Sequence, residues 1–181
     1  MHDPVAAWHE EHVFFERLLG LFERELAAFH AGGQPNYELM LDIVTYLRHY
    51  PDRVHHPRED ATFEFLVRRD ASLRKQVDHL RQEHHLIAAA SDTLLVTLNE
   101  IADGAMLARE QLEADARSYL ALYRRHLQAE ESGVMPRARE LLTAQEWEAA
   151  ARAVPHEPDP LFGEAFEERY RELRRQIALE S

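Results

Sequence analysis

The chain has 181 residues, of which 45% are hydrophobic and 30% charged, with only six glycines, as expected of a soluble helical domain that can bury a core. A net charge of −12 argues against nucleic acid and anionic membranes as partners, because both are bound mainly through Lys and Arg. Without cysteine, disulfides, thiolate metal sites and Cys nucleophiles are excluded, so any metal must be held by His and carboxylate.

The N-terminal residues lack the basic and apolar regions of a signal peptide. No apolar run approaches the roughly 20 residues that a membrane-spanning helix needs. We therefore expect a cytoplasmic protein that does not bind a membrane.

The first predicted helix covers residues 4–31. Apolar residues recur along it in alternating steps of three and four, and His12 stands in the same seam. A buried imidazole without a partner is costly, so His12 is either a core residue bonded to a neighbour or part of a polar site. Gly32 and Asn36 are suited to the C-cap of this helix and the N-cap of the next.

The second predicted helix covers residues 37–69 and contains two prolines. Pro51 and Pro57 each remove a backbone donor and should kink or briefly interrupt the helix. Because they flank the tandem histidines at 55 and 56, they affect the direction in which these side chains point.

This helix also places a histidine four residues before an acid, which puts both side chains on one face. Two pairs have this spacing, His55 with Glu59 and His56 with Asp60. The first pair is favoured because it lies nearer the apolar seam of residues 47–54. The choice between the pairs stays open.

The third predicted helix covers about residues 71–102, with His84 in an unbroken apolar seam. The fourth begins near Leu107, and along it His126 precedes Glu130 by four residues, as His55 precedes Glu59. The second copy of the spacing supports the choice of the first pair in the second helix.

The two halves of the chain match. His12 precedes His55 by 43 residues, and His84 precedes His126 by 42. The repeat predicts an all-α, up-down-up-down four-helix bundle in residues 1–142, and residues 143–181 form a C-terminal helical extension that packs on it. The predicted metal ligands, which would converge in the bundle core, are His12, His55, Glu59, His84, His126 and Glu130.

Imidazole and carboxylate ligands without thiolate suit iron, manganese or zinc. Four histidines with two carboxylates suit a pair of ions better than one. The Glu-x-x-His pairs of ferritin-like di-iron proteins and the His-Glu-x-x-His of zinc proteases are absent. A bonded core histidine explains each residue separately but does not explain the repeated set.

The arrangement resembles the hemerythrin-like superfamily of HHE cation-binding domains. The motifs that carry the similarity are Glu11-His12, His55-His-Pro-Arg-Glu59-Asp60, Glu83-His84, His126-x-x-x-Glu130-Glu131 with Met135-Pro136 after it, and Asp159-Pro-Leu-Phe-Gly163. The resemblance implies a bundle that holds two non-haem iron ions with carboxylate and oxo or hydroxo bridges, with manganese or zinc as alternatives. It also implies the division of ligands: His12 and His55 on one iron, His84 and His126 on the other, and Glu59 and Glu130 as bridges.

One position departs from this pattern. Oxygen-carrying members have a second histidine one turn before the residue that matches His84, and this chain has Leu80 there. One iron would then lack a ligand unless His85, Asp60, Glu131 or water supplies it. The more open site favours sensing or reacting with oxygen, peroxide or nitric oxide, or handling iron, over reversible oxygen storage.

Three functions follow as hypotheses. The first is a cytoplasmic di-iron protein that binds or senses O2, NO or peroxide or handles iron. The second is a di-iron oxidoreductase that removes peroxide or nitric oxide, and the third is a metal-free helical interaction module. A homodimer and an unidentified protein partner are compatible with each. Tyr123 and Tyr119, about one and two turns before His126, are interpreted as core aromatics and alternatively as groups beside the metals.

Overall fold

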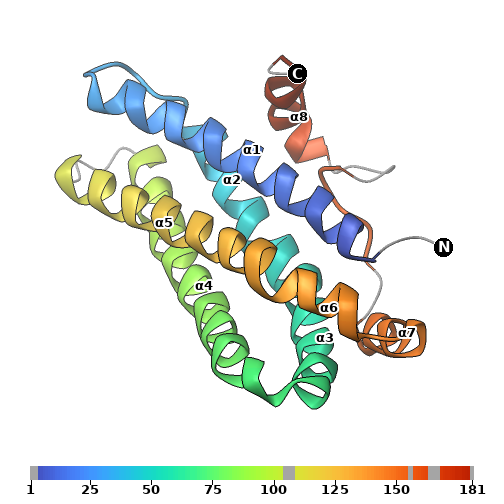
Figure 1. Cartoon of the computed structure of the whole chain (residues 1–181). Helices are drawn as coiled ribbons and strands as arrows, with labels where there is room; N and C mark the ends of the chain where they lie inside the picture. Colours follow the sequence, from blue (N-terminus) through green and yellow to red (C-terminus); the bar gives the residue numbers. More distant parts are fainter. Residues whose placement is uncertain (1–3, 104–108, 155–156, 163–167, 180–181) are drawn as a thin grey trace.

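A computed structural model of the chain describes residues 4–103, 109–154, 157–162 and 168–179 (Figure 1). These residues form helices and connecting turns and contain no strand, which confirms the predicted all-α class. Four helical columns run up, down, up and down. The predicted start of the fourth helix near Leu107 falls outside the described residues.

The first and third columns are single long helices. They are α1 (Pro4–His30) and α4 (Arg74–Ala102), the latter preceded by a 3-10 turn, η2 (Ala71–Leu73). α1 packs against α2 and α5, and α4 packs against the same two helices, so the columns form a square (Figure 1).

The second column keeps its direction through both prolines. It consists of α2 (Tyr37–Tyr50), a π-helical turn η1 (Pro51–His55) and α3 (His56–Arg69). Pro51 begins the π turn and Pro57 stands in the first turn of α3, where a missing N–H costs least. The fourth column has the same order of segments, an α-helix, a π-helical turn and a second α-helix. They are α5 (Arg109–Ala129), η3 (Glu130–Val134) and α6 (Met135–Leu141).

The predicted cap residues between the first two columns are confirmed. Gly32 has a φ of 84°, a left-handed conformation that suits glycine. The side chain of Asn36 accepts a hydrogen bond of 3.0 Å from the backbone N–H of Leu39, which caps α2.

Two large apolar clusters lie within the bundle, and a minor third cluster joins Val5 and Trp8 of α1 to Met135 of α6. The larger cluster includes Phe22, Leu47 and Leu94, and the smaller one includes Phe63 and Leu80 near the turn that joins α3 to α4. The seam histidines His12 and His84 are buried in the bundle, with 4% and 6% of their surface exposed.

Two short helices follow the bundle. α7 (Ala144–Ala153) packs against α3, and the ring of Trp147 meets that of Trp8 edge-on, with centroids 5.3 Å apart. A capping box between Thr143 and Glu146 fixes the start of α7.

The remainder of the extension docks on α1 and α2. The Tyr46 hydroxyl donates a 2.8 Å hydrogen bond to Asp159, whose carboxylate also accepts from the backbone N–H groups of Leu161 and Phe162. Phe162 stacks on Phe14 at 4.1 Å, and η4 (Glu168–Tyr170) leads into α8 (Arg171–Leu179), which contacts α2. Of the Asp159–Gly163 motif, the last residue lies outside the described residues. None of the described helices has the length and apolar character needed to cross a membrane.

Candidate metal centre

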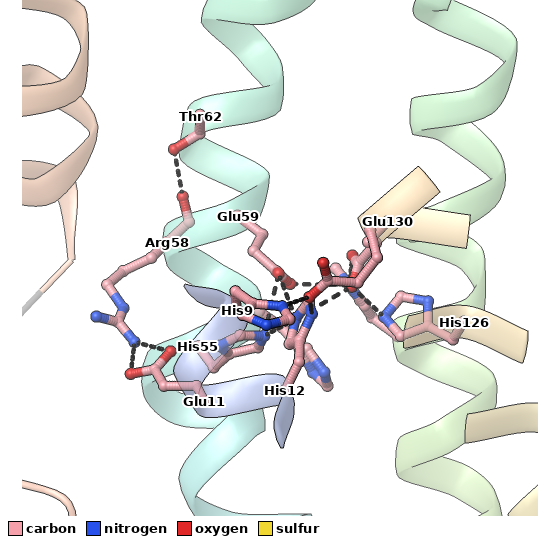
Figure 2. Close-up of polar contacts among 12 residues, drawn as sticks. His9, Glu11, His12, His55, Arg58, Glu59, Thr62, His126 and Glu130 are labelled. Atoms are coloured by element: carbon pink, nitrogen blue, oxygen red, sulfur yellow. Dashed lines mark hydrogen bonds and ion pairs between the residues drawn. The ribbon is translucent and has the colours of Figure 1, made fainter. Parts of the chain in front are cut away.

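The six ligands predicted from the sequence lie in one buried layer across all four columns. Four have no exposed surface, and the others expose 6% or less; they are His12, His55, Glu59, His84, His126 and Glu130. In Figure 2 the carboxylates of Glu59 and Glu130 turn toward one another, with histidines around them.

Glu59 faces histidines from both halves of the chain. Its Oε1 lies 3.0 Å from His55 Nε2 and 3.4 Å from His12 Nε2, and its Oε2 lies 3.5 Å from His84 Nε2. One carboxylate thus directs one oxygen to each half of the site. This is the arrangement that a carboxylate bridging two cations requires.

Glu130 also faces both halves. Its Oε2 lies 3.6 Å from His12 Nε2 and 3.3 Å from His126 Nε2, and its Oε1 lies 3.5 Å from His84 Nε2. Neighbouring ligand atoms around one ion with bonds of about 2.1 Å have separations of about 3 Å. The donor spacing therefore fits coordination of metal ions of this size.

A fifth imidazole, from His56, joins the layer. His56 is 4% exposed, and its ring stacks on that of His84 with centroids 4.1 Å apart and planes 11° apart. It also lies edge-on to His126 at 5.8 Å. The wider turn of the π segment η1 directly before it allows two consecutive histidines to point inward. The tandem His55-His56 between two prolines was the sequence signal for this.

The donors form two groups that share Glu59. One group is His12, His55, Glu59 and Glu130, and the other is His56, Glu59, His84 and His126. We call these the two-histidine group and the three-histidine group. Within each, the ligating atoms lie within 4.8 Å of one another.

The structure offers a further candidate for the donor that the sequence lacks at Leu80. Leu80 is fully buried in the smaller apolar cluster, but His56 supplies a third imidazole beside His84 from a different column. None of the three substitutes considered from the sequence belongs to either donor group: His85 is exposed, and Asp60 and Glu131 lie farther out. The group with fewer imidazoles contains His12 and His55 instead.

Each of the five histidines has a carboxylate beside its outer nitrogen, Nδ1. The pairs and their Nδ1-to-oxygen distances are His12–Glu131 at 2.8 Å, His55–Glu11 at 2.6 Å, His56–Asp52 at 2.8 Å, His84–Asp60 at 3.5 Å and His126–Glu83 at 3.3 Å. The His84–Asp60 contact is not a hydrogen bond, whereas in His12, His55, His56 and His126 the contact is a hydrogen bond, and the acceptor places the proton on Nδ1 and leaves the Nε2 lone pair facing the centre. This is the tautomer that a metal-binding histidine needs.

Arginines hold two of these outer carboxylates. Arg58 donates to both oxygens of Glu11, at 2.6 and 2.7 Å, and Figure 2 shows the resulting Arg58–Glu11–His55 chain. Burial raises the pKa of Glu11, but His55 and Arg58 outweigh it and lower that pKa to about 2. Arg125 donates from two nitrogens to one oxygen of Glu83, at 2.9 and 3.1 Å.

The inner carboxylates make the centre attractive to cations. Burial by itself lowers the pKa of a histidine, but hydrogen bonds and the charges of nearby carboxylates raise the pKa of His12 to about 10 and that of His84 to about 12. His56 differs, because burial and the neighbouring His84 and His55 lower its pKa well below the usual value. Its ring is neutral and can act as a ligand.

Buried atoms without hydrogen-bond partners gather at this centre. Over the described ranges, they are Glu59 Oε1 and Oε2, Glu130 Oε1 and Oε2, His84 Nδ1 and Nε2, His126 Nε2, and the Tyr123 hydroxyl. Leaving a buried polar atom unpaired costs about 1–3 kcal/mol, so several in one place indicate a site for a bound group. Oxygen and imidazole nitrogen donors fit iron, manganese or zinc.

Comparison with known proteins agrees with this geometry. The family model of the hemerythrin HHE cation-binding domain matches residues 3–138, which is most of the chain and includes every residue of both donor groups. No curated protein and no solved structure matches the chain. The chain belongs to the hemerythrin family of HHE cation-binding domains.

Proposed function

We propose that this protein holds a non-haem di-iron centre and uses it to bind or sense a small molecule such as O2, NO or peroxide. The observation that carries the proposal is the pair of donor groups that share the Glu59 carboxylate. A single ion would use only one oxygen of Glu59 and would leave one half of the histidines without a partner.

The asymmetry of the donors supports a role in binding small molecules. Each group has four donors, but Glu59 and Glu130 face histidines of both groups, so with both carboxylates shared the three-histidine ion would have one imidazole donor more than the other ion. The ion at His12 and His55 would therefore retain more room for an external ligand. When bound, iron supplies this open coordination and the capacity to exchange electrons with the ligand.

The surrounding residues would hold the centre rigid and exclude bulk water. The outer carboxylates fix the histidine rings, and Phe15 packs edge-on against His55 at 5.0 Å. The buried donors also argue against a metal-free interaction module, because such a module gains nothing from unpaired carboxylates in its core.

The test is anaerobic addition of Fe(II) to chelator-treated protein, followed by elemental analysis and by mixing with O2, NO or peroxide. We expect about two irons per chain and a new visible absorption on exposure to one of these molecules. The variant Glu59→Ala should lose iron, whereas Glu64→Ala, which removes an exposed acid from the same helix, should not.

Each other result identifies a different function. Consumption of many equivalents of peroxide or NO per centre would make the protein an oxidoreductase. If the protein binds manganese or zinc in preference to iron, the proposed di-iron centre would instead be a centre of that metal. If the protein takes up no metal and the Glu59 variant keeps its fold, the metal-free helical interaction module would be the function that the results support.

A further inference from the structure

Tyr123 carries a buried hydroxyl that neither the fold nor the metal ligation accounts for. The residue has no exposed surface, and its hydroxyl has no hydrogen-bond partner among the described residues. Within the described ranges, all other buried side-chain atoms that share this property belong to Glu59, Glu130, His84 or His126. The unpaired atoms of the described chain are therefore confined to the proposed ligands and this phenol.

The neighbouring Tyr119 shows that the unpaired state is not general for tyrosines in this core. Tyr119 is 1% exposed, and its hydroxyl accepts a 3.3 Å hydrogen bond from Ser91. The two rings meet edge-on at 5.7 Å. The hydroxyl of Tyr119 thus has a hydrogen-bond partner within the protein, whereas the hydroxyl of Tyr123, one turn nearer His126, has none among the described residues.

The internal repeat matches Tyr123 with Asp52, the residue that bonds to His56. Tyr123 stands 71 positions after Asp52, as His126 stands 71 positions after His55. Asp52 accepts a hydrogen bond from His56, the additional histidine of the three-histidine group. In the second half, Leu127 stands where the first half has His56, so the imidazole that Asp52 supports has no counterpart beside Tyr123 in the repeat.

Tyr123 and both histidines of the two-histidine group have an aromatic neighbour in common, Phe15. Phe15 lies edge-on to Tyr123 at 6.4 Å and edge-on to His55 at 5.0 Å. The pKa of Tyr123 is raised by burial, by Tyr119 and by the charges of three nearby carboxylates, Asp52, Glu59 and Glu130. The phenol therefore keeps its proton and has an O–H that it can donate to an acceptor at the centre.

We propose that the Tyr123 hydroxyl donates a hydrogen bond to the small molecule bound beside the two-histidine group, and that it selects ligands with an acceptor atom. The inference rests on the proposed dinuclear centre. In place of a third imidazole, this half of the site would provide open coordination and a hydrogen-bond donor aimed at its occupant.

The test compares Tyr123→Phe with the matched variant Tyr119→Phe in full-length, iron-loaded, oxidised protein, with azide as the probe. Both variants should retain about two irons per chain. We expect the azide dissociation constant to rise roughly tenfold in the Tyr123 variant, as for loss of one hydrogen bond to a charged acceptor, and to stay unchanged in the Tyr119 variant. Equal azide affinity in Tyr123→Phe and the wild type would overturn the inference, as would failure of the wild type to bind azide.

A measurement on metal-free protein separates this inference from the dinuclear centre itself. Tyr123→Phe removes an unpaired buried hydroxyl and should raise the melting temperature, whereas Tyr119→Phe loses the Ser91 bond and should lower it. A lower melting temperature for Tyr123→Phe would mean that the hydroxyl has a partner within the fold and would overturn the inference. Iron uptake well below two per wild-type chain would instead overturn the proposed function.

Discussion

The imidazole rings of His56 and His84 stack in parallel, although they come from opposite halves of the chain. His56 has no histidine counterpart in the second half, where Leu127 occupies the matching position. The stacked pair therefore breaks the symmetry of the repeat. It gives one half of the centre three imidazoles and the other half two.

Replacement of His56 by alanine should lower bound metal from about two ions to about one per chain. The three-histidine group would lose one of its four donors, while the two-histidine group would keep all of its own. Elemental analysis of reconstituted protein measures this directly. His85→Ala is the control, because His85 is exposed and belongs to neither group. A loss of metal in the His85 variant, with full loading in His56→Ala, would contradict the assignment.

Removal of the outer negative charge at Glu11 should weaken metal binding about 10–100-fold, the range typical of carboxylates that orient a ligating histidine. Glu11→Gln keeps the size of the side chain but weakens the 2.6 Å hydrogen bond that orients His55. Competition with a chelator of known affinity gives the change. Glu10→Gln, which alters an exposed neighbour, should leave affinity unchanged. Equal affinities for the two variants would count against the role of Glu11.

Metal-free protein should become less stable as the pH rises from about 6.5 toward 10. Folding raises the pKa of His12 to about 10 and that of His84 to about 12, so the folded state binds protons that the unfolded state releases in this interval. The stabilising contribution is complete below the unfolded pKa and is lost as the pH passes the folded one. Melting temperatures in the presence of a chelator at several pH values measure the effect.

The iron-loaded protein is the control for this pH dependence. Bound metal replaces the protons on the inner histidines, so its melting temperature should change less over the same interval. A flat pH profile for the metal-free protein would show that these histidines are not protonated in the folded state.

Replacement of Trp147 by alanine should lower the free energy of unfolding by about 1–3 kcal/mol, because a partly buried aromatic contact is lost. The Trp147 ring packs on Trp8 and so joins α7 to α1. Metal content should not change, since neither residue belongs to a donor group. Chemical denaturation measures the difference, with Glu148→Ala as the control. An unchanged midpoint for Trp147→Ala would mean that α7 does not stabilise the bundle.

The sequence predicted the bundle well because helical periodicity is a local property. The seam of α1 is apolar except at His12, and the structure buries this residue together with the apolar residues beside it. The cap residues Gly32 and Asn36 were also predictable, since each acts within one turn of its own position. The ligation of metal by the six predicted residues remains a prediction, although the structure gathers all six in one layer.

The role of His56 was not predictable in the same way. An α-helix rotates by about 100° per residue, so two consecutive histidines should not both face the core. The π turn at Pro51–His55 changes this rotation, and the sequence signalled only an irregularity there. The choice between His55 and His56 was therefore posed as an alternative, whereas the structure brings both rings into the centre.

The sequence by itself determined the helical columns, the repeat and the buried histidine and glutamate positions, because these depend on spacing along one helix. Only the tertiary structure decided which residues from different columns meet. It placed His56 beside His84, Glu11 beside His55, and the Tyr123 hydroxyl without a partner. These relations depend on the rotation and offset of packed helices, which local periodicity does not fix.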